Sequence, residues 1–154
     1  MPEGITPVQN FDQSAYLGRW YEIARLDNRF EKGMSQVTAN YSLNSDGSIR
    51  VLNKGFVDEE QRWAEAEGKA KFVDATDVAH LKVSFFGPFY SSYIVFDLAE
   101  DYSHSYVTSS ERDYLWFLSR TPQVSSEQKT HFLETIKTLG FASKDVIFID
   151  QSKH

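Results

Sequence analysis

Three short segments carry residues suited to a specific non-covalent contact: Gly18-Arg19-Trp20, Asp101-Tyr102 and Arg120. A guanidinium stacks favourably on an indole through cation–π attraction, so Arg120 can cap Trp20. Gly18 allows a tight backbone turn in front of the indole. Asp101-Tyr102 can stabilise a turn through hydrogen bonds from the side chain to the backbone. Such a set would seal one end of a closed β-barrel, and we expect these residues to be structural.

Residues able to perform covalent or metal chemistry show no recognisable arrangement. The 4 histidines are separated along the chain and lack the H-x-x-x-H or H-E-x-x-H spacing of zinc sites. The sequence contains no cysteine, no G-x-S-x-G nucleophile elbow and no glycine-rich phosphate loop. A role for His80 in haem or metal binding is conceivable, but a solvated histidine at a strand end explains it better. We therefore predict no cofactor, no metal and no enzymatic activity.

Length and charge narrow the classes of protein further. A chain of 154 residues suits one domain. Its net charge of -6, with acidic and basic residues interspersed, lacks the basic footprint of nucleic-acid-binding proteins. The longest apolar runs fall far short of the roughly 20 residues that a membrane-spanning helix needs. We expect an N-terminal tail over residues 1–10, a single domain over residues 11–154, and no nucleic-acid partner.

Short runs of alternating apolar and polar residues, with turn residues about every ten positions, are typical of an all-β barrel or sandwich. Asp46-Gly47 marks one hairpin. After the strands, residues 125–128 read as a capping box, and apolar residues then recur at helical spacing up to Gly140. We predict an eight-stranded antiparallel up-and-down β-barrel with one C-terminal α-helix packed on its outer wall and a short strand near residues 146–149. The predicted barrel strands are residues 18–26, 37–43, 48–55, 62–72, 79–85, 93–98, 104–109 and 113–120.

Alternation along each strand predicts which side chains face the barrel interior. If Trp20 points inward, so do Glu22 and Ala24. In the strand at 93–98, Tyr93 with Val95 and Ile94 with Phe96 are equally acceptable inward pairs. The strand at 62–72 has a small inward row of alanine and glycine, which would leave room for a ligand. The predicted ligand-binding residues are Ala24, Tyr41, Val51, Asn53, Ala66, Gly68, Val83, Phe85, Tyr114, Trp116 and Leu118.

Glu22 is the polar residue with the least obvious role. A carboxylate inside a barrel is unfavourable unless it is paired or protonated. We expect Glu22 to bind Arg120 or tyrosines near the closed end, and direct contact with a ligand is the alternative. At the opposite end, the loops carry Phe30, Met34, Phe89 and Tyr90, which predicts an apolar rim.

The motifs resemble those of the lipocalins, whose signature is a G-x-W on the first strand, a D-Y near the turn between the sixth and seventh strands, and an arginine on the last strand. Gly18, Trp20, Asp101-Tyr102 and Arg120 match it. Residues 17–25, 85–90 and 113–122 look like the bacterial outer-membrane lipoprotein subgroup. The resemblance implies binding of a monoacyl lipid, either a lysophospholipid or a fatty acid, for transport, storage or membrane lipid maintenance.

Proteins of that subgroup carry a secretory signal and a lipid-modified cysteine. The resemblance therefore implies localisation at the outer membrane, on its periplasmic side, through a lipid anchor carried by the precursor. We expect Met1 to stand where that cysteine would be. A natively leaderless cytosolic form is the alternative.

Three functions are compatible with the sequence. A lipid carrier explains the small-residue wall, the apolar rim and the lack of catalytic groups. An enzyme that modifies a lipid or isoprenoid in the same cavity is the second, and a protein–protein interaction module is the third. Exposed aromatic residues also make a homodimer possible.

Overall fold

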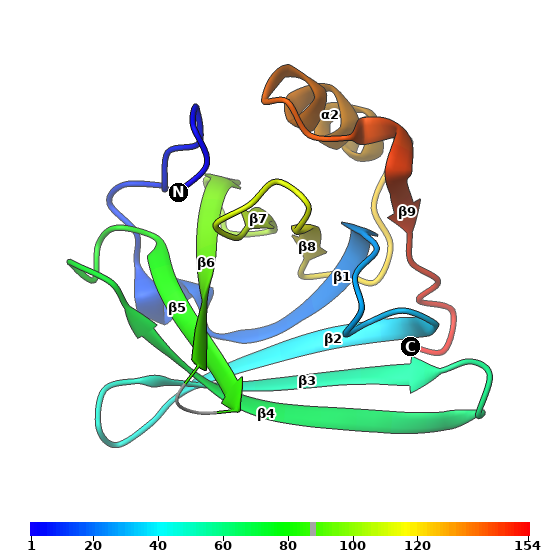
Figure 1. Ribbon diagram of the computed structural model, residues 1–154, viewed down its shortest axis with the longest axis horizontal. Helices are drawn as coiled ribbons and strands as arrows, with labels where there is room; N and C mark the ends of the chain where they lie inside the picture. Colours follow the sequence, from blue (N-terminus) through cyan, green and yellow to red (C-terminus); the bar gives the residue numbers. More distant parts are fainter. Residues whose placement is uncertain (87–88) are drawn as a thin grey trace.

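Eight antiparallel strands form a closed barrel in the computed structural model, which describes residues 1–86 and 89–154 (Figure 1). Each strand pairs with the next one along the chain, and β1 also pairs with β8, so the sheet closes on itself. The predicted barrel is confirmed. Its strands are β1 (Gly18–Leu26), β2 (Met34–Leu43), β3 (Ile49–Val57), β4 (Arg62–Phe72), β5 (His80–Phe86), β6 (Phe89–Leu98), β7 (His104–Thr108) and β8 (Leu115–Ser119).

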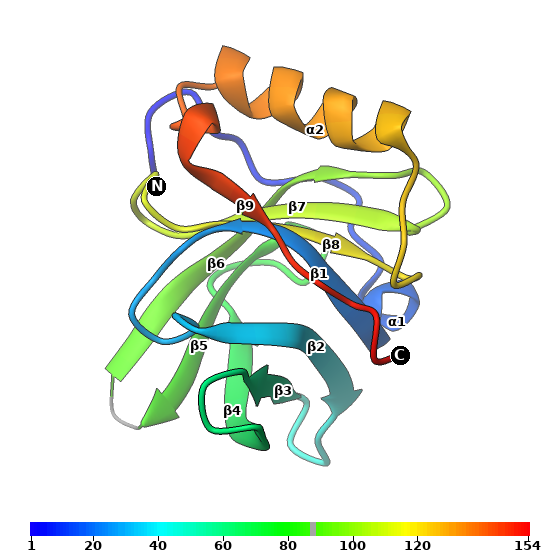
Figure 2. The same ribbon diagram turned by 90° about the vertical axis from the view of Figure 1, so that its right-hand side faces the viewer.

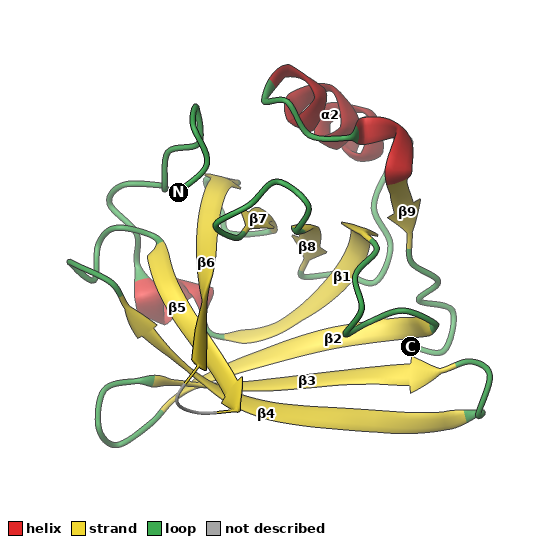
Figure 3. Cartoon of the chain, viewed as in Figure 1, coloured by secondary structure: helices red, strands yellow, loops and turns green. Residues whose placement is uncertain are grey.

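The segments outside the barrel are a short helix α1 (Gln13–Tyr16), the longer helix α2 (Ser126–Thr138), a 3-10 turn η1 (Ser143–Asp145) and strand β9 (Val146–Phe148) (Figure 3). The predicted capping box begins α2, because Ser125 and Gln128 exchange side-chain to backbone hydrogen bonds. Figure 2 shows α2 lying outside the barrel, with β9 running back along β1. No helix among residues 1–86 and 89–154 has the length and apolar character needed to cross a membrane.

Apolar residues form one core inside the barrel and a second one beneath α2. Trp20 and Val95 belong to the inner core, whereas Phe117 packs against Phe132 of α2 in the outer core. This second core explains why both faces of β1 and β8 are apolar. The two cores also decide which side chains of β6 face the interior. Tyr93 and Val95 belong to the inner core, whereas Ile94 belongs to the outer core beneath α2.

The prediction that Ala24 faces the interior is wrong. Glu22 pairs with Leu118, but Ala24 pairs with Phe117, so β1 has one more residue than β8 between these two pairs. A β-bulge of this kind breaks the alternation of side chains. Ile23 and Ala24 both face the outer core, and the next residue, Arg25, returns to the inner side of the strand opposite Trp116.

The small-residue wall of β4 also differs from expectation. Strand β4 pairs with β3 over its length from Arg62 to Ala70, but with β5 only from Lys69 to Phe72. Its first half therefore extends beyond β5, as Figure 1 shows. As a result Ala66 is exposed. A Cβ atom on Gly68 would meet the Phe85 ring at 2.8 Å, so no free space lies above this glycine.

Candidate functional site

Arg120 and Trp20 close the lower end of the barrel. The guanidinium carbon lies 3.8 Å from the centroid of the fully buried indole. The guanidinium also donates to the carbonyl oxygens of Arg19 at 2.9 Å, Ala15 at 2.8 Å and Tyr102 at 3.3 Å. One side chain thus joins β1, α1 and the turn between β6 and β7. The guanidinium reaches these three carbonyl oxygens because the start of β1, the end of β8 and the turn between β6 and β7 all lie at the floor of the barrel.

Helix α1 completes this floor, a feature that alternation along strands does not predict. Asp12 caps the helix through its side chain. The indole Nε1 of Trp20 donates to the carbonyl oxygen of Tyr16 at 2.9 Å, and the backbone amide of Asp12 donates to Tyr102 Oη at 2.9 Å. Asp101 stabilises its turn as expected, since its Oδ1 accepts from the amide of Ser103 at 3.0 Å.

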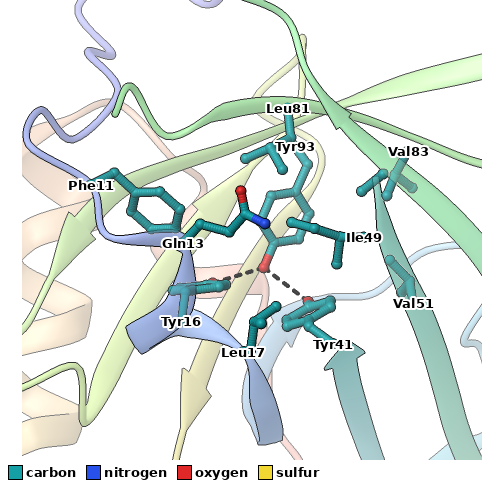
Figure 4. A pocket seen from close by; sticks show the side chains of 11 residues that line it. Phe11, Gln13, Tyr16, Leu17, Tyr41, Ile49, Val51, Leu81, Val83 and Tyr93 are labelled. Carbon is teal, nitrogen blue, oxygen red and sulfur yellow. Dashed lines mark hydrogen bonds between the residues drawn. The ribbon is translucent and has the colours of Figure 1, made fainter. Parts of the chain in front are cut away.

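Two cavities lie inside the barrel. The lower cavity, at the α1 end, has a volume of ≈ 20 Å³ and an apolar wall (Figure 4). The upper cavity has a volume of ≈ 100 Å³ and includes Glu31, from the loop between β1 and β2, in its wall. Tyr41 and Tyr93 line both cavities and therefore lie between them. The interior thus changes from apolar at the floor to partly polar toward the open end.

Three tyrosines join their hydroxyl groups between the cavities. Tyr93 Oη lies 2.9 Å from Tyr41 Oη and 2.7 Å from Tyr16 Oη, as the dashed lines in Figure 4 show. Tyr16 Oη also lies 2.8 Å from Ser105 Oγ. Burial raises the pKa of Tyr16 to about 12 and the pKa values of Tyr41 and Tyr93 well above their ordinary range. All three remain neutral at physiological pH and act as hydrogen-bonding groups.

A buried ion pair lies beside the upper cavity. Arg25 Nη1 is 3.5 Å from Glu22 Oε2, and both side chains are only 2% exposed. Arg25 Nε donates to Asp27 Oδ1 at 3.1 Å, while Nη2 donates to the carbonyl oxygens of Glu31 at 2.8 Å and Met34 at 3.1 Å. The expected partner of Glu22, Arg120, is instead held at the floor. The bulge in β1 explains the difference, because it brings Arg25 to the side of Glu22.

Two carboxyl groups face the upper cavity, those of Glu22 and Glu31. Burial and the neighbouring Glu31 raise the pKa of Glu22 well above its ordinary value, and Arg25 opposes this shift only in part. Glu31 Oε1 accepts hydrogen bonds from Trp116 Nε1 at 2.7 Å and from Asn28 Nδ2 at 2.9 Å. The loop between β1 and β2 is therefore tied to the indole of β8 across the top of this cavity.

The predicted ligand-binding residues fall into two groups, and their contacts with a ligand remain predictions. Ala24, Ala66, Gly68, Phe85 and Tyr114 line neither cavity; the Tyr114 ring stacks on Trp116 with centroids 6.1 Å apart. Those that line a cavity are Tyr41, Val51, Asn53, Val83, Trp116 and Leu118.

Sequence reasoning missed the cavity residues that lie outside the strands. Glu31 comes from a loop, and Tyr16 and Gln13 come from α1. The Asp-Gln-Ser-Ala segment at 12–15, with a capping residue ahead of a short polar stretch, is the signal that could have indicated α1.

No group of three or more metal-ligating side chains occurs in the parts of the chain that the structure describes. At the open end, Phe30 is 63% exposed and Phe89 is 80% exposed, which agrees with an apolar rim.

Known proteins resemble this chain over nearly its whole length. The family description "lipocalin-like domain" matches residues 11–151. Outer membrane lipoprotein Blc of Vibrio cholerae is 51% identical over 152 residues, 98% of this chain and 89% of the relative. The protein of the same name from Escherichia coli K12 is 50% identical over 150 residues, 97% of this chain and 85% of the relative.

Solved structures agree on the fold. Insecticyanin from the tobacco hornworm Manduca sexta superimposes with a TM-score of 0.78 at 20% sequence identity, over 99% of this chain and 87% of insecticyanin. With a sealed barrel floor, an interior cavity, a matching family domain and relatives of about half identical sequence over nearly its whole length, this chain belongs to the lipocalin family.

Proposed function

We propose that this protein binds one monoacyl lipid, a lysophospholipid or a fatty acid, inside the barrel and carries or stores it. The observation that carries the proposal is the gradient inside the calyx: an apolar lower cavity under a larger, partly polar upper cavity. A lipid with one chain matches this gradient if its tail points toward the floor and its polar group lies above. Each methylene group removed from water would contribute about 0.8 kcal/mol.

Continuous occupation of both cavities requires Tyr41 and Tyr93 to separate, because their side chains lie between them. A hydrogen bond of this type contributes only about 1 kcal/mol net, so burial of a few methylene groups offsets its loss. Opening of this tyrosine pair is therefore part of the proposal. An eight-stranded barrel has room for one small ligand, so we do not expect a second acyl chain to fit.

The place of action is the outer membrane. Relatives of about half identical sequence are named outer membrane lipoproteins, which supports attachment through a lipid anchor. The periplasmic face, where lysophospholipids released from the membrane could be collected, is the side that we propose. Binding without turnover is the activity expected, since the residues around the cavities offer hydrogen bonds but no activated nucleophile.

Tryptophan fluorescence provides the test. Trp116 lines the upper cavity, so titration with a lysophospholipid should change its emission, and Trp116→Phe should abolish most of that change. Trp63, on β4 and 40% exposed, supplies the matched control: Trp63→Phe should leave the change intact. Native mass spectrometry should show one lipid per chain, recovered unmodified. Equal affinity for diacyl phospholipids, or recovery of a chemically altered lipid, would overturn the proposal.

A further inference from the structure

The N-terminal segment is packed against the barrel over most of its length. The backbone amide of Phe11 donates to the carbonyl oxygen of Asp77 at 2.9 Å, and that of Val8 donates to the carbonyl oxygen of Val95 at 2.9 Å. Ile5 is 5% exposed and belongs to the outer core. This segment is therefore a fixed part of the fold and differs from a flexible tether.

The first residues of this segment lie at the open end of the barrel. Arg112, in the loop between β7 and β8, donates to the carbonyl oxygen of Glu3 and, at 2.8 Å, to that of Leu139 after α2. This loop is at the open end because the other end of β8 leads to Arg120 at the floor. Figure 2 shows the N-terminus on the side where β7 and β8 are joined, with α1 at the opposite end. A lipid anchor attached ahead of residue 1 would consequently leave the protein at its open end.

Exposed aromatic side chains flank this point. Around the open end, the loop between β7 and β8 lies between the β5–β6 hairpin and the β1–β2 hairpin, because β6 pairs with β7 and β8 pairs with β1. Phe30, between β1 and β2, is 63% exposed, and Phe89, at the start of β6, is 80% exposed. The loop between β3 and β4 lies across the opening and carries three consecutive acidic residues at 58–60. The apolar part of the rim is thus on the same side as the N-terminus.

A cationic side chain accompanies two of the exposed rings at the rim. The Arg29 guanidinium carbon lies 4.9 Å from the centroid of the Phe30 ring, and Lys82 Nζ lies 5.2 Å from that of Tyr90. Both cations are exposed, and neither forms an ion pair in the described part of the chain. Rings beside arginine or lysine suit the headgroup layer of a membrane, where the ring is buried and the cation meets phosphate. Because the chain has a net charge of -6, burial of the rings would supply most of the attraction.

We propose that the open end of the barrel rests on the lipid bilayer that holds the anchor, with Phe30 and Phe89 inserted among the headgroups. This inference rests on the proposed function, which supplies the anchor ahead of residue 1. Two independent observations support it: the fixed path of the N-terminal segment and the position of the exposed rings. In this orientation a monoacyl lipid passes between the bilayer and the calyx without crossing bulk water.

A lipid attached at residue 1 makes this orientation measurable. The chain has no cysteine, so Met1→Cys, at a residue that is 60% exposed, offers a single thiol for coupling to a lipid with a maleimide headgroup. The vesicles consist of phosphatidylethanolamine and phosphatidylglycerol with a phospholipid brominated on its acyl chains, and bromine quenches tryptophan emission on contact. Phe30→Trp and Phe89→Trp, made separately in this background, each place one further tryptophan at the rim.

The control tryptophan is placed at the floor. Leu43→Trp, at the C-terminal end of β2 and 57% exposed, lies at the far end of the barrel. Brominated lipid should remove most of the emission added by Phe30→Trp and by Phe89→Trp, and little of that added by Leu43→Trp. Vesicles without bromine give the reference emission for each variant.

A second comparison isolates the N-terminal segment. Insertion of about twenty glycine and serine residues after residue 1 replaces the fixed attachment by a flexible tether. Quenching of Phe30→Trp should then fall, because the barrel can turn away from the bilayer. Unchanged quenching would show that the rim orients the barrel alone and would overturn the role of the N-terminal segment.

The outcomes separate the orientation from the proposed function. Equal quenching at the rim and at the floor, or quenching at neither, overturns the orientation. Titration of the untethered protein with a lysophospholipid tests binding in the calyx without any effect of orientation. If that binding is absent while the rim tryptophans are strongly quenched, the proposed function fails and the orientation stands.

Discussion

Phe85 covers Gly68: a Cβ atom on this glycine would lie 2.8 Å from two carbon atoms of the ring and 2.7 Å from the carbonyl oxygen of Ser84. The contact occurs where β4 stops pairing with β5, since Lys69 and Ser84 form the last pair on that side. The ring therefore fills the interior at the point where the two strands separate. Gly68 is small to admit this ring, and the space over it is occupied by protein.

Gly68→Ala should therefore destabilise the fold. Overpacking of a filled interior costs about 1–3 kcal/mol, which exceeds the gain of up to about 1 kcal/mol from replacing glycine in a strand. Urea unfolding of the variant and the native protein measures the difference. Ala66→Ser, two residues away at an exposed position, should change the free energy of unfolding by less than about 0.5 kcal/mol. Equal stability of Gly68→Ala and the native protein would contradict the packing described.

The floor should depend on Trp20 and Arg120 as a unit. Trp20→Ala removes a fully buried indole and should destabilise by about 3–5 kcal/mol. Arg120→Ala loses the stacking and three hydrogen bonds to backbone carbonyls. Because the two side chains are in contact, the double variant should lose less than the sum of the single losses, by about 0.5–3 kcal/mol. Additive losses in urea unfolding would mean that the stacking contributes nothing.

Arg120→Lys separates stacking from charge. Lysine keeps the positive charge but lacks the planar guanidinium that stacks on Trp20 and donates to three carbonyl oxygens. We expect it to recover only a small part of the stability lost in Arg120→Ala. Full recovery would show that charge alone is sufficient at this position.

The sequence predicts the barrel well because burial enforces a period of two wherever a strand has neighbours on both sides, which the first half of β4 lacks. That argument gives the inward positions of Trp20, Trp116 and Leu118, because Trp20 precedes the bulge in β1 and β8 pairs with β7 without a register shift. It fails at Ala24, because a bulge depends on how one strand pairs with its neighbour and leaves no mark in the alternation of a single strand. It also says nothing about Glu31, whose position in the cavity wall depends on how a loop folds over the open end.

Glu22 should make stability depend on pH in a specific direction. Its pKa in the folded state is raised well above its ordinary value of 4.5, so the folded protein holds a proton that the unfolded chain releases. Between these two pKa values the folded state binds more protons, and stability therefore falls as pH rises through this window. Below pH 4.5 Glu22 is protonated in both the folded and the unfolded state, so its titration no longer makes stability depend on pH.

Glu22→Gln isolates this contribution, because it keeps the volume and removes the titration. Asp97, whose pKa is also raised by burial, adds a loss of the same sign in both proteins and cancels in the difference. Unfolding in urea across a series of pH values should show the stability of the native protein falling relative to Glu22→Gln as pH rises above 4.5. A difference that stays constant with pH would show that the buried carboxyl titrates at its ordinary value.

Removal of Arg25 should lower the free energy of unfolding, in part because the buried carboxyl of Glu22 loses its neighbouring cation. Arg25→Met takes away a guanidinium that binds two carboxyl groups and the carbonyl oxygens of Glu31 and Met34, and breaking a buried ion pair typically costs about 3–5 kcal/mol. Part of this loss comes from leaving Glu22 without its cation. Adding Glu22→Gln to Arg25→Met should therefore recover stability at neutral pH, whereas adding Glu65→Gln on the exposed face of β4 should recover none. If Glu22→Gln makes Arg25→Met less stable instead, the loop contacts of Arg25 stabilise the fold and its charge on Glu22 does not.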